Sequence, residues 1–242
     1  MTSPRLYLLD VEGTTSPISL VSEQLFPYAR RHLRAYLHEH AGEPEADADF
    51  ALLVGENNAE TAADVPRFAR FEDIDRAGDY LLWLMDRDRK STALKSLQGK
   101  VWKAGFEGGE LVGTVFPDVP EALARWSRAA KVAIYSSGSV EAQQLLFRHS
   151  SAGDLTPFLS GYFDTRVGAK GAADSYRAIA AAAGVATDEI LFVSDAVREL
   201  DAAREAGCGT RLSVREGNAP VAQPHRHTAI RSFAEIARLQ TL

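Results

Sequence analysis

The sequence contains a single cysteine, Cys208. One cysteine cannot form a disulfide within the chain, so a reducing compartment is expected and the protein is predicted to be cytoplasmic. Cys208 directly follows Gly207, a glycine that ends an expected helix. This position favours a structural role for the cysteine over that of a catalytic thiol.

Long apolar runs and basic runs are also missing. No window approaches the roughly 18 consecutive apolar residues of a membrane span, and the short apolar segment near the start meets Asp10 too soon for a secretory signal. The formal net charge is −6, and no run of Lys or Arg supplies the basic stripe that nucleic-acid binding usually requires. We therefore expect no membrane and no nucleic-acid partner. A monomer is the expected oligomeric state, although no sequence pattern indicates it.

What is present is an ordinary globular composition over 242 residues, with 45% apolar and 25% charged residues. Short apolar segments, within "LYLLDVEGTTSPISL", "KVAIYSSGS", "GYFDTRVGAKG", "EILFVSD" and "TRLSV", alternate with helical segments, two of which end at Gly184 and Gly207. This alternation predicts an α/β fold with a Rossmann-like parallel-sheet core covered by helices. Such sheets bind ligands at the carboxyl ends of their strands.

A different pattern interrupts this alternation. The segment "EQLFPYARRHLRAYLHEH" has an amphipathic helical pattern, "AGEPEADAD" is interpreted as a polar acidic break, and "DYLLWLMDRDRK" resumes a helix. Ser91 is expected to cap a further helix, "TALKSLQGKVWKAGF". We therefore predict a helical insertion over residues 19–112, within an α/β core formed by residues 1–18 and 113–242.

Two carboxylates follow the first apolar segment, in "LYLLDVEGTTSPISL". Asp10 and Glu12 point to the same side if the extended conformation persists to Gly13. Two carboxylates this close raise each other's proton affinity unless a cation lies beside them, and their hard oxygen atoms suit Mg²⁺. The alternative interpretation is a solvated loop.

Two segments later in the chain are typical of phosphate binding. In "AIYSSGS", Ser136 and Ser137 end a strand ahead of a helix that begins near Val140, where hydroxyl and N–H groups can cradle a phosphate. The alternative is that one serine only caps the helix. In "GAKGAADSY", the ammonium of Lys170 can neutralise a phosphoryl oxygen, although a lone loop lysine is usually solvated.

A last acidic group follows the apolar segment of "ILFVSDAVRELDAA". Asp195 is placed to add a metal ligand, and the alternative is an N-cap of the next helix. Glu199, one helical turn further on, could hold a metal-bound water, but Glu199 and Asp201 are interpreted as supporting or surface residues.

The order of these residues resembles that of the haloacid dehalogenase-like phosphatases over the whole chain, including a helical cap inserted after the first motif. The superfamily commonly has a second Asp where this chain has Glu12. The stretches "DVEGTTSPI", "DRKSTALKSLQGKVW", "IYSSGSVEAQQLLF" and "LFVSDAVRELDAA" resemble the enolase-phosphatases of methionine salvage, also called acireductone synthases. The lysine motif, "VGAKGAADSY", matches most loosely but keeps the lysine and the "SY".

The resemblance implies an enzyme that converts 2,3-diketo-5-methylthiopentyl-1-phosphate into the acireductone 1,2-dihydroxy-3-keto-5-methylthiopentene and phosphate, with one Mg²⁺ per subunit. Asp10 would be the nucleophile and Glu12 the acid-base group. Ser136, Ser137 and Lys170 would bind the phosphate, with Lys170 also counted as catalytic. The metal positions would be Asp10, the main-chain carbonyl of Glu12, and Asp195.

The enolisation step stays open. Glu12 is a candidate base and Mg²⁺ or Lys170 a candidate electrophile, while the cap residues Lys95 and Glu107 are further candidates. Phe26, Trp83 and Trp102 are candidates for contact with the methylthio tail, or they form the core of the cap itself. Two other functions compete: a plain phosphomonoesterase on the same scaffold, and a catalytically silent metal- or phosphopeptide-binding module.

Overall fold

A computed structural model describes residues 3–69, 73–221 and 224–239 of the chain. The chain divides into two compact units, one formed by Met1–Val21 and Val112–Leu242, the other by Ser22–Leu111. The first unit contains a sheet and the second is helical. Among the described residues, none of the helices combines the length and the apolar character needed to cross a membrane.

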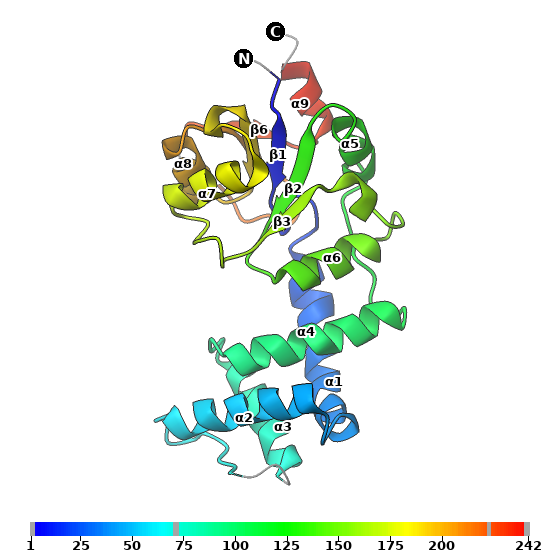
Figure 1. Cartoon of the computed structure of the whole chain (residues 1–242), viewed down its shortest axis with the longest axis vertical. Helices are drawn as coiled ribbons and strands as arrows, with labels where there is room; N and C mark the ends of the chain where they lie inside the picture. The colour runs from blue at the N-terminus through cyan, green and yellow to red at the C-terminus, as the bar shows by residue number, and fades with distance from the viewer. Residues whose placement is uncertain (1–2, 70–72, 222–223, 240–242) are drawn as a thin grey trace. The chain divides into compact units, whose positions relative to one another are not determined.

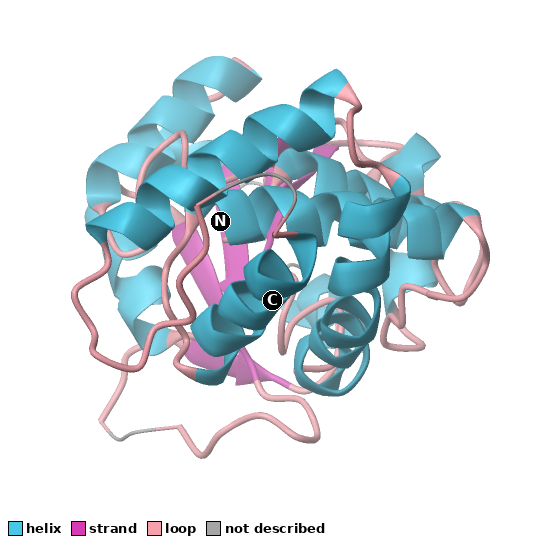
Figure 2. Cartoon of the chain, turned by 90° about the horizontal axis from the view of Figure 1, so that it is seen from below, coloured by secondary structure: helices cyan, strands magenta, loops and turns pink. Residues whose placement is uncertain are grey.

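The first unit contains a six-stranded sheet in the order β3-β2-β1-β4-β5-β6, in which neighbouring strands are parallel. Figure 2 shows the strands of the sheet in magenta, lying side by side. The strands are β1 (Leu6–Leu9), β2 (Lys131–Tyr135), β3 (Gly161–Phe163), β4 (Ile190–Ser194), β5 (Gly209–Ser213) and β6 (Thr228–Ile230). The predicted Rossmann-like parallel sheet is confirmed; the short β6 was not predicted.

Helices cover both faces of this sheet. They are α5 (Val119–Trp126), α6 (Val140–Arg148), α7 (Ala173–Ala183), α8 (Val197–Glu205) and α9 (Ala234–Leu239), with 3₁₀ turns η2 (Thr156–Phe158) and η3 (Thr187–Glu189). Figure 1 shows α7 and α8 on one side of the sheet and α5 and α9 on the other. The predicted C-terminal glycine of α7 is present, because Gly184 adopts the left-handed conformation with a φ of 66°.

The central strand β1 contributes to the core on both faces. Leu6 and Leu8 belong to the same buried cluster as Tyr176 of α7. Tyr7 points to the opposite face, where its ring stacks on Trp126 of α5 with the centroids 4.3 Å apart. Since both faces are covered, the strand is a continuous apolar run rather than an alternating one.

Strand β1 also marks the point where the strand order reverses. Leu9 pairs with Ile134 of β2 on one side and with Val193 of β4 on the other, so the three strands end at the same level. The connections then run outward in opposite directions, to β3 on one side and to β5 and β6 on the other. A crevice at the carboxyl ends of the strands is expected at such a switch point.

Cys208 lies in the buried core of this unit. Burial raises the pKa of its thiol to about 12. The thiol therefore stays protonated near neutral pH and unreactive, because the thiolate is the nucleophilic form.

The second unit contains four α-helices, α1 (Phe26–Glu39), α2 (Pro44–Ala59), α3 (Ile74–Asp86) and α4 (Thr92–Glu107). The π-helical turn η1 (Leu20–Leu25) leads into α1. Within the described residues 22–69 and 73–111 this unit has no strand, in line with the predicted helical insertion. Ser91 caps α4 as expected, since its hydroxyl accepts the N–H of Leu94 at 2.9 Å.

Helix α2 corrects one sequence interpretation. The acidic segment at residues 41–49 was expected to be a break, but α2 begins within it at Pro44. Proline suits the first turn of a helix because its missing N–H is not needed there. Glu45 and Asp47 then lie in the first turn, where negative charge favours the positive end of the helix dipole.

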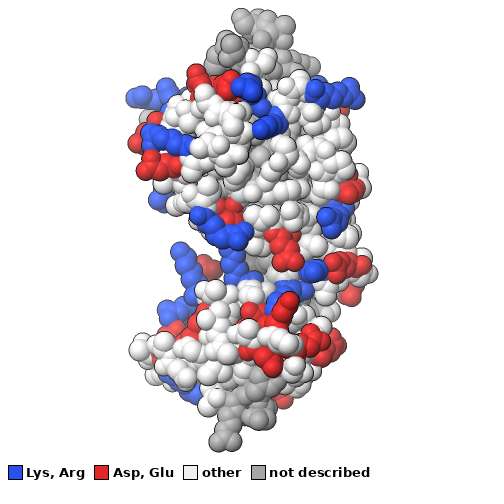
Figure 3. Space-filling model, viewed as in Figure 1, with Lys and Arg blue, Asp and Glu red and all other residues white. Residues whose placement is uncertain are grey.

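Charges of both signs are mixed on the surface. The face shown in Figure 3 carries basic and acidic side chains side by side in both units. Helices α1 and α3 form such pairs, for example Arg30 with Asp86 and Arg34 with Asp79, each at 2.6 Å. Exposed pairs of this kind contribute only about 0.2–1 kcal/mol each to stability.

Glu56 is expected to stabilise the helical unit more than any of these surface pairs. Its carboxylate, on α2, accepts the N–H groups of Thr92 (2.9 Å) and Ala93 (3.2 Å) at the start of α4, and the hydroxyl of Ser91. Replacing Glu56 with alanine should lower the free energy of unfolding by about 1–2 kcal/mol, because the first turn of α4 loses its acceptor.

Urea unfolding followed by circular dichroism measures this change. Glu39→Ala, at an exposed position of α1, is the control and should leave the midpoint nearly unchanged. An equal shift in the two variants would show that Glu56 contributes no more than a surface charge.

Candidate active site

Asp10 and Glu12 lie in a tight turn directly after β1. The strand ends at Leu9, so the extended conformation does not persist to Gly13 as the sequence interpretation assumed. Instead the N–H groups of Thr14, Thr15 and Ser16 all donate to the carbonyl of Val11. The turn nevertheless directs both carboxylates to one place, because Asp10 and Glu12 line the same cavity.

This cavity has a volume of about 180 Å³ and lies at the carboxyl ends of β1, β2 and β4. Its size is below the roughly 300–1,000 Å³ of pockets that hold a drug-sized ligand, so it suits a small polar group such as a phosphate. All six site residues predicted from the sequence line it. Its lining consists of Asp10, Glu12, Ile18, Ser136, Ser137, Lys170, Asp195 and Glu199.

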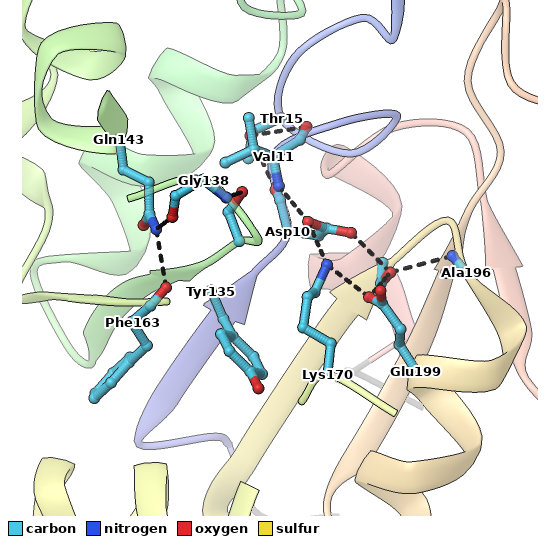
Figure 4. Close-up of polar contacts among 12 residues, drawn as sticks. Asp10, Val11, Thr15, Tyr135, Gly138, Gln143, Phe163, Lys170, Ala196 and Glu199 are labelled. Carbon is cyan, nitrogen blue, oxygen red and sulfur yellow. Dashed lines mark hydrogen bonds and ion pairs between the residues drawn. The ribbon is translucent and has the colours of Figure 1, made fainter. Parts of the chain in front are cut away.

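Lys170 bridges two carboxylates in this cavity. Its Nζ atom lies 2.7 Å from Oδ1 of Asp10 and 2.7 Å from Oε2 of Glu199 (Figure 4). Burial lowers the pKa of Lys170, but the charges of Asp10 and Glu199 more than offset this and raise the pKa above its ordinary value. The lysine therefore stays protonated. The solvated loop lysine, which was the alternative, is excluded because the side chain is only 11% exposed.

Asp10 is held from several directions. Its Oδ1 accepts the N–H of Val11 at 2.7 Å, and its Oδ2 lies 3.0 Å from the hydroxyl of Ser194. The hydroxyl of Thr15 donates to its main-chain carbonyl at 2.9 Å. Figure 4 shows the carboxylate between Lys170 and the end of β4. The Asp10 side chain is thus fixed in orientation and almost fully buried.

The other carboxyl groups of the cavity have a raised proton affinity. Burial and then the charge of Asp10 raise the pKa of Asp195 to about 6. The same two causes, in the same order, raise the pKa values of Glu12 and Glu199. Four carboxyl groups and one lysine line the cavity, so the site favours an additional cation.

Ser136 and Ser137 follow β2 and precede α6. The predicted start of α6 near Val140 is confirmed, but the residue that caps it is Ser139, whose hydroxyl accepts the N–H of Ala142 at 3.2 Å. The alternative that Ser136 or Ser137 caps the helix is therefore wrong. Both serines line the cavity instead.

Gln143 of α6 fixes the same turn. Its Nε2 donates to the carbonyls of Gly138 and Phe163, each at 2.9 Å (Figure 4). The side chain of Gln143 is buried, and no feature of the sequence singled it out. It joins the serine turn to the end of β3, so the cradle for a phosphate is built on the sheet rather than on a free loop.

Two comparisons place this geometry in a family. A family model described as haloacid dehalogenase-like hydrolase matches residues 4–207. Enolase-phosphatase E1 of Synechococcus elongatus is 53% identical over 230 residues, which cover 95% of this chain and 96% of that protein. The chain belongs to the enolase-phosphatase E1 family.

Two further proteins are similar to this chain over most of its length. A probable bifunctional methylthioribulose-1-phosphate dehydratase/enolase-phosphatase E1 of Physcomitrium patens is 43% identical over 245 residues, covering 97% of this chain and 48% of that protein. The crystal structure of the UTR4 protein of Saccharomyces cerevisiae has a TM-score of 0.78 and 33% identity, and covers 96% of this chain and 100% of that one. The match therefore includes the helical unit as well as the sheet.

The cavity of this enolase-phosphatase E1 family member does not contain a ready-made cluster of metal-binding side chains among the described residues. Among the described residues, no three His, Cys, Asp or Glu side chains are grouped as a metal cluster. The predicted magnesium site needs fewer, because Glu12 would contribute only its main-chain carbonyl. Asp195 lies against the turn that carries this carbonyl, so closely that a side chain at Gly13 would overlap its carboxylate. This set of hard oxygen atoms fits Mg²⁺.

Asp195 itself is not a helix cap. The N-cap position of α8 is occupied by Ala196, and it is the hydroxyl of Ser194 that accepts the Ala196 N–H, at 3.1 Å. The alternative role of Asp195 is therefore wrong, and its carboxylate lines the cavity. Ser194 was not singled out by the sequence, although it lies within hydrogen-bond distance of both Asp10 and Glu199.

The end of β5 and the segment that follows it hold the turn that carries Asp10 and Glu12. Ser213 and Asn218 donate to the carbonyl of Gly13 at 2.9 and 3.0 Å, and Arg215 lies 3.3 Å from the carbonyl of Thr14. These three residues were missed by sequence analysis. Their polar run after an apolar strand was the available signal, but the partners are about 200 residues away in the chain.

The cap candidates lie in the helical unit. Trp83 is buried and its ring stacks with Tyr80, so it belongs to the core of that unit. Phe26 is 43% exposed and lies beside Trp102, with ring centroids 6.3 Å apart. Asp201, on α8, pairs with His227 at 3.0 Å, which accounts for it as a supporting residue outside the cavity lining.

Proposed function

We propose that the protein is an acireductone synthase that converts 2,3-diketo-5-methylthiopentyl-1-phosphate into 1,2-dihydroxy-3-keto-5-methylthiopentene and phosphate, as a step of methionine salvage. The observation that carries the proposal is the cavity in which Lys170 pairs with Asp10 beside Glu12 and Asp195. Its support from the family is the 53% identity to an enolase-phosphatase E1. The fused dehydratase named in the Physcomitrium patens relative acts on a methylthio sugar phosphate, which agrees with such a substrate.

Asp10 is the proposed nucleophile. A carboxylate oxygen of Asp10 attacks phosphorus while the bond from phosphorus to the substrate oxygen breaks, which leaves an aspartyl-phosphate. The hydrogen bond from Val11 and the ion pair with Lys170 hold the carboxylate in one orientation before attack. A fixed orientation lowers the entropy cost of the step.

Glu12 is the proposed acid-base group. Protonated Glu12 donates its proton to the leaving substrate oxygen, and the resulting carboxylate then takes a proton from water. That water attacks phosphorus, the bond to Asp10 breaks, and phosphate leaves. The raised pKa of Glu12, caused by burial and then by Asp10, supports the protonated form in the first step.

Lys170 and the two serines are the proposed phosphate ligands. The negative charge of phosphoryl transfer spreads over the three non-bridging oxygens, so fixed donors act where charge develops. Ser136 and Ser137 supply donors from the turn after β2, and Lys170 supplies its ammonium from the loop before α7.

One Mg²⁺ per subunit is the proposed cofactor. Asp10, the main-chain carbonyl of Glu12 and Asp195 would hold it, and when bound it supplies positive charge that neutralises the phosphate oxygens. The carbonyl role leaves the Glu12 side chain available for proton transfer. Ser213 and Asn218 fix the neighbouring Gly13 carbonyl, so the turn is built before any ligand arrives.

The enolisation needs a base near the carbon that loses a proton and a positive group near the carbonyl oxygen. Within the cavity, Lys170 supplies the positive group; the base for this step is not assigned. We assign residues 22–111 the role of a cap that excludes water from the enol intermediate.

The physical state of the enzyme is part of the proposal. We propose a cytoplasmic monomer that acts on this small phosphorylated diketone, without nucleic-acid or membrane partners. The single cysteine and the absence of long basic runs in the sequence support it. Light scattering after size exclusion should give the mass of one chain, 26.3 kDa. A mass of two or more chains would contradict the monomer.

The decisive experiment supplies the diketo phosphate with Mg²⁺ and follows ultraviolet absorbance and phosphate release together. We expect absorbance of the conjugated enol to rise before phosphate appears, because enolisation precedes dephosphorylation. Phosphate release without new absorbance would identify a plain phosphomonoesterase, the competing function on this scaffold. Binding of the substrate with neither signal would identify a silent binding module.

A further inference from the structure

Three buried hydroxyl groups hold three successive carbonyls in the loop that carries Lys170. Tyr135 donates to the carbonyl of Gly168 at 2.9 Å. Ser175 donates to that of Ala169 at 2.8 Å, and Tyr176 to that of Lys170 at 2.7 Å. We call Tyr135, Ser175 and Tyr176 the hydroxyl clamp. Ser175 and Tyr176 are the "SY" of the lysine motif, "VGAKGAADSY".

The two tyrosines of the clamp are themselves fixed by packing. Tyr135 ends β2 and Tyr176 lies on α7, and both side chains are fully buried in the core. Their rings meet edge to face with centroids 5.7 Å apart, and Tyr176 also packs on Phe192 of β4 at 5.1 Å. Since ring positions in a close-packed core vary little, each hydroxyl is delivered to a defined point.

The loop approaches α7 so closely that only glycine fits at one position. Gly168 has a φ of 140°, a conformation that L side chains rarely adopt, and a side chain there would overlap the hydroxyl of Ser175. The bond from Ser175 to Ala169 depends on this approach. The glycine at position 168 thus allows the loop to come within hydrogen-bond distance of Ser175.

Tyr176 connects the lysine to its carboxylate partner. Besides the 2.7 Å contact with the Lys170 carbonyl, its hydroxyl lies 3.1 Å from the carbonyl of Glu199. A phenol has a single proton, so the shorter contact is the stronger bond. The Lys170 carbonyl is therefore the main acceptor, and the same hydroxyl lies beside the backbone of Glu199, whose side chain pairs with Lys170 at 2.7 Å.

Both phenols remain donors near neutral pH. Burial raises the pKa of Tyr135 and of Tyr176, and for Tyr176 the charge of Glu199 adds to the effect. The two phenols of the clamp therefore keep their protons near neutral pH.

We propose that the hydroxyl clamp positions the Lys170 ammonium for phosphate binding. The inference rests on the proposed function, because it takes the phosphate role of Lys170 as given. A lysine side chain carries about 2 kcal/mol of rotamer entropy, so a fixed backbone at Lys170 reduces what phosphate binding must still order. Two of the three N–H groups point at Asp10 and Glu199, and the third is left for a phosphate oxygen.

A purely structural role is the competing explanation, because buried carbonyls need donors in any protein. The two explanations differ in one respect. A positioning role acts through the Lys170 side chain and vanishes when that side chain is removed, whereas a structural role persists without it.

The test measures the affinity for inorganic phosphate by calorimetry with Mg²⁺ present, in the wild-type and Lys170→Met backgrounds. Tyr176→Phe keeps the ring and loses the hydroxyl. We expect it to weaken phosphate binding about threefold to tenfold in the wild-type background, the effect of one lost hydrogen bond, and to have no measurable effect with Lys170→Met. Ser175→Ala is the second variant and should behave in the same way.

Tyr162→Phe is the matched control. Tyr162 lies on β3 with a buried hydroxyl that has no hydrogen-bond partner among the described residues. Its loss of a hydroxyl should leave phosphate affinity unchanged in both backgrounds. Thermal unfolding of each variant verifies that it folds. If Tyr176→Phe fails to fold, Ser175→Ala tests the positioning role in its place.

The possible results separate the inference from the function on which it rests. Equal weakening by Tyr176→Phe in the two backgrounds would overturn the positioning role and leave a structural one. Unchanged affinity in Tyr176→Phe and Ser175→Ala, with weakened binding in Lys170→Met, would also overturn the inference but not the proposed function. Unchanged affinity in Lys170→Met itself would overturn the phosphate role of Lys170 and the inference together.

Discussion

Replacing Asp10 with asparagine should abolish phosphate release, with a loss of at least about a thousandfold in kcat. The amide has nearly the shape of the carboxylate but is not a nucleophile toward phosphorus. Its oxygen can still accept the N–H of Val11, which donates to Oδ1 of Asp10 at 2.7 Å. The turn is therefore expected to stay in place while the covalent step is lost.

Phosphate release and phosphate binding measured on the same variant separate chemistry from folding. Asp10→Asn should still bind inorganic phosphate with Mg²⁺, though less well because one proposed metal ligand is weakened. Asp174→Asn is the matched control: its carboxylate lies on α7, 93% exposed and paired with Arg177, and its loss should leave turnover unchanged. Substantial turnover in Asp10→Asn would falsify the aspartyl-phosphate assignment.

Replacing Glu12 with glutamine should slow the breakdown of the phosphoenzyme, by about 10²–10⁴-fold. Glutamine cannot take a proton from the attacking water, so hydrolysis of the aspartyl-phosphate loses its general base. The main-chain carbonyl of residue 12 is unchanged, and metal binding should be retained. This combination distinguishes a proton-transfer group from a metal ligand.

Rapid quenching followed by mass spectrometry of the intact chain measures the phosphoenzyme. We expect it to accumulate in Glu12→Gln and to be scarce in the wild type during turnover. Glu121→Gln, 87% exposed on α5, controls for loss of a carboxylate in the same unit. If the phosphoenzyme neither accumulates nor forms more slowly in Glu12→Gln, another group is the acid-base catalyst.

The parts of the fold that were predicted correctly depend on neighbours in the chain. The buried strands were recognised as short apolar runs, and α4 by its apolar spacing and its Ser91 cap. These features follow from local geometry, because side-chain periodicity and capping involve residues within one or two turns. The α2 error has the same origin, since Pro44 and the acids after it were interpreted by polarity rather than by their fit to a helix start.

The residues predicted for the site each come after a strand and carry distinctive chemistry, and their roles stay predictions. Asp10, Ser136, Lys170 and Asp195 meet at one cavity. The supporting residues were not found, since Gln143 or Ser194 resembles any polar residue until its partner is known. Ser194 lies 184 residues from Asp10 in the chain, and no local pattern reports such a contact.

The sequence by itself determined the strand-helix alternation, the helical insertion, and the residue types that phosphoryl transfer requires, because these are properties of short stretches. Only the tertiary structure decided that a turn, rather than a continued strand, aims Asp10 and Glu12. It also decided that Lys170 joins Asp10 to Glu199, and that buried hydroxyls hold the lysine loop. Those arrangements depend on the order of parallel strands and on packing between distant segments, which bring together groups that the chain keeps far apart.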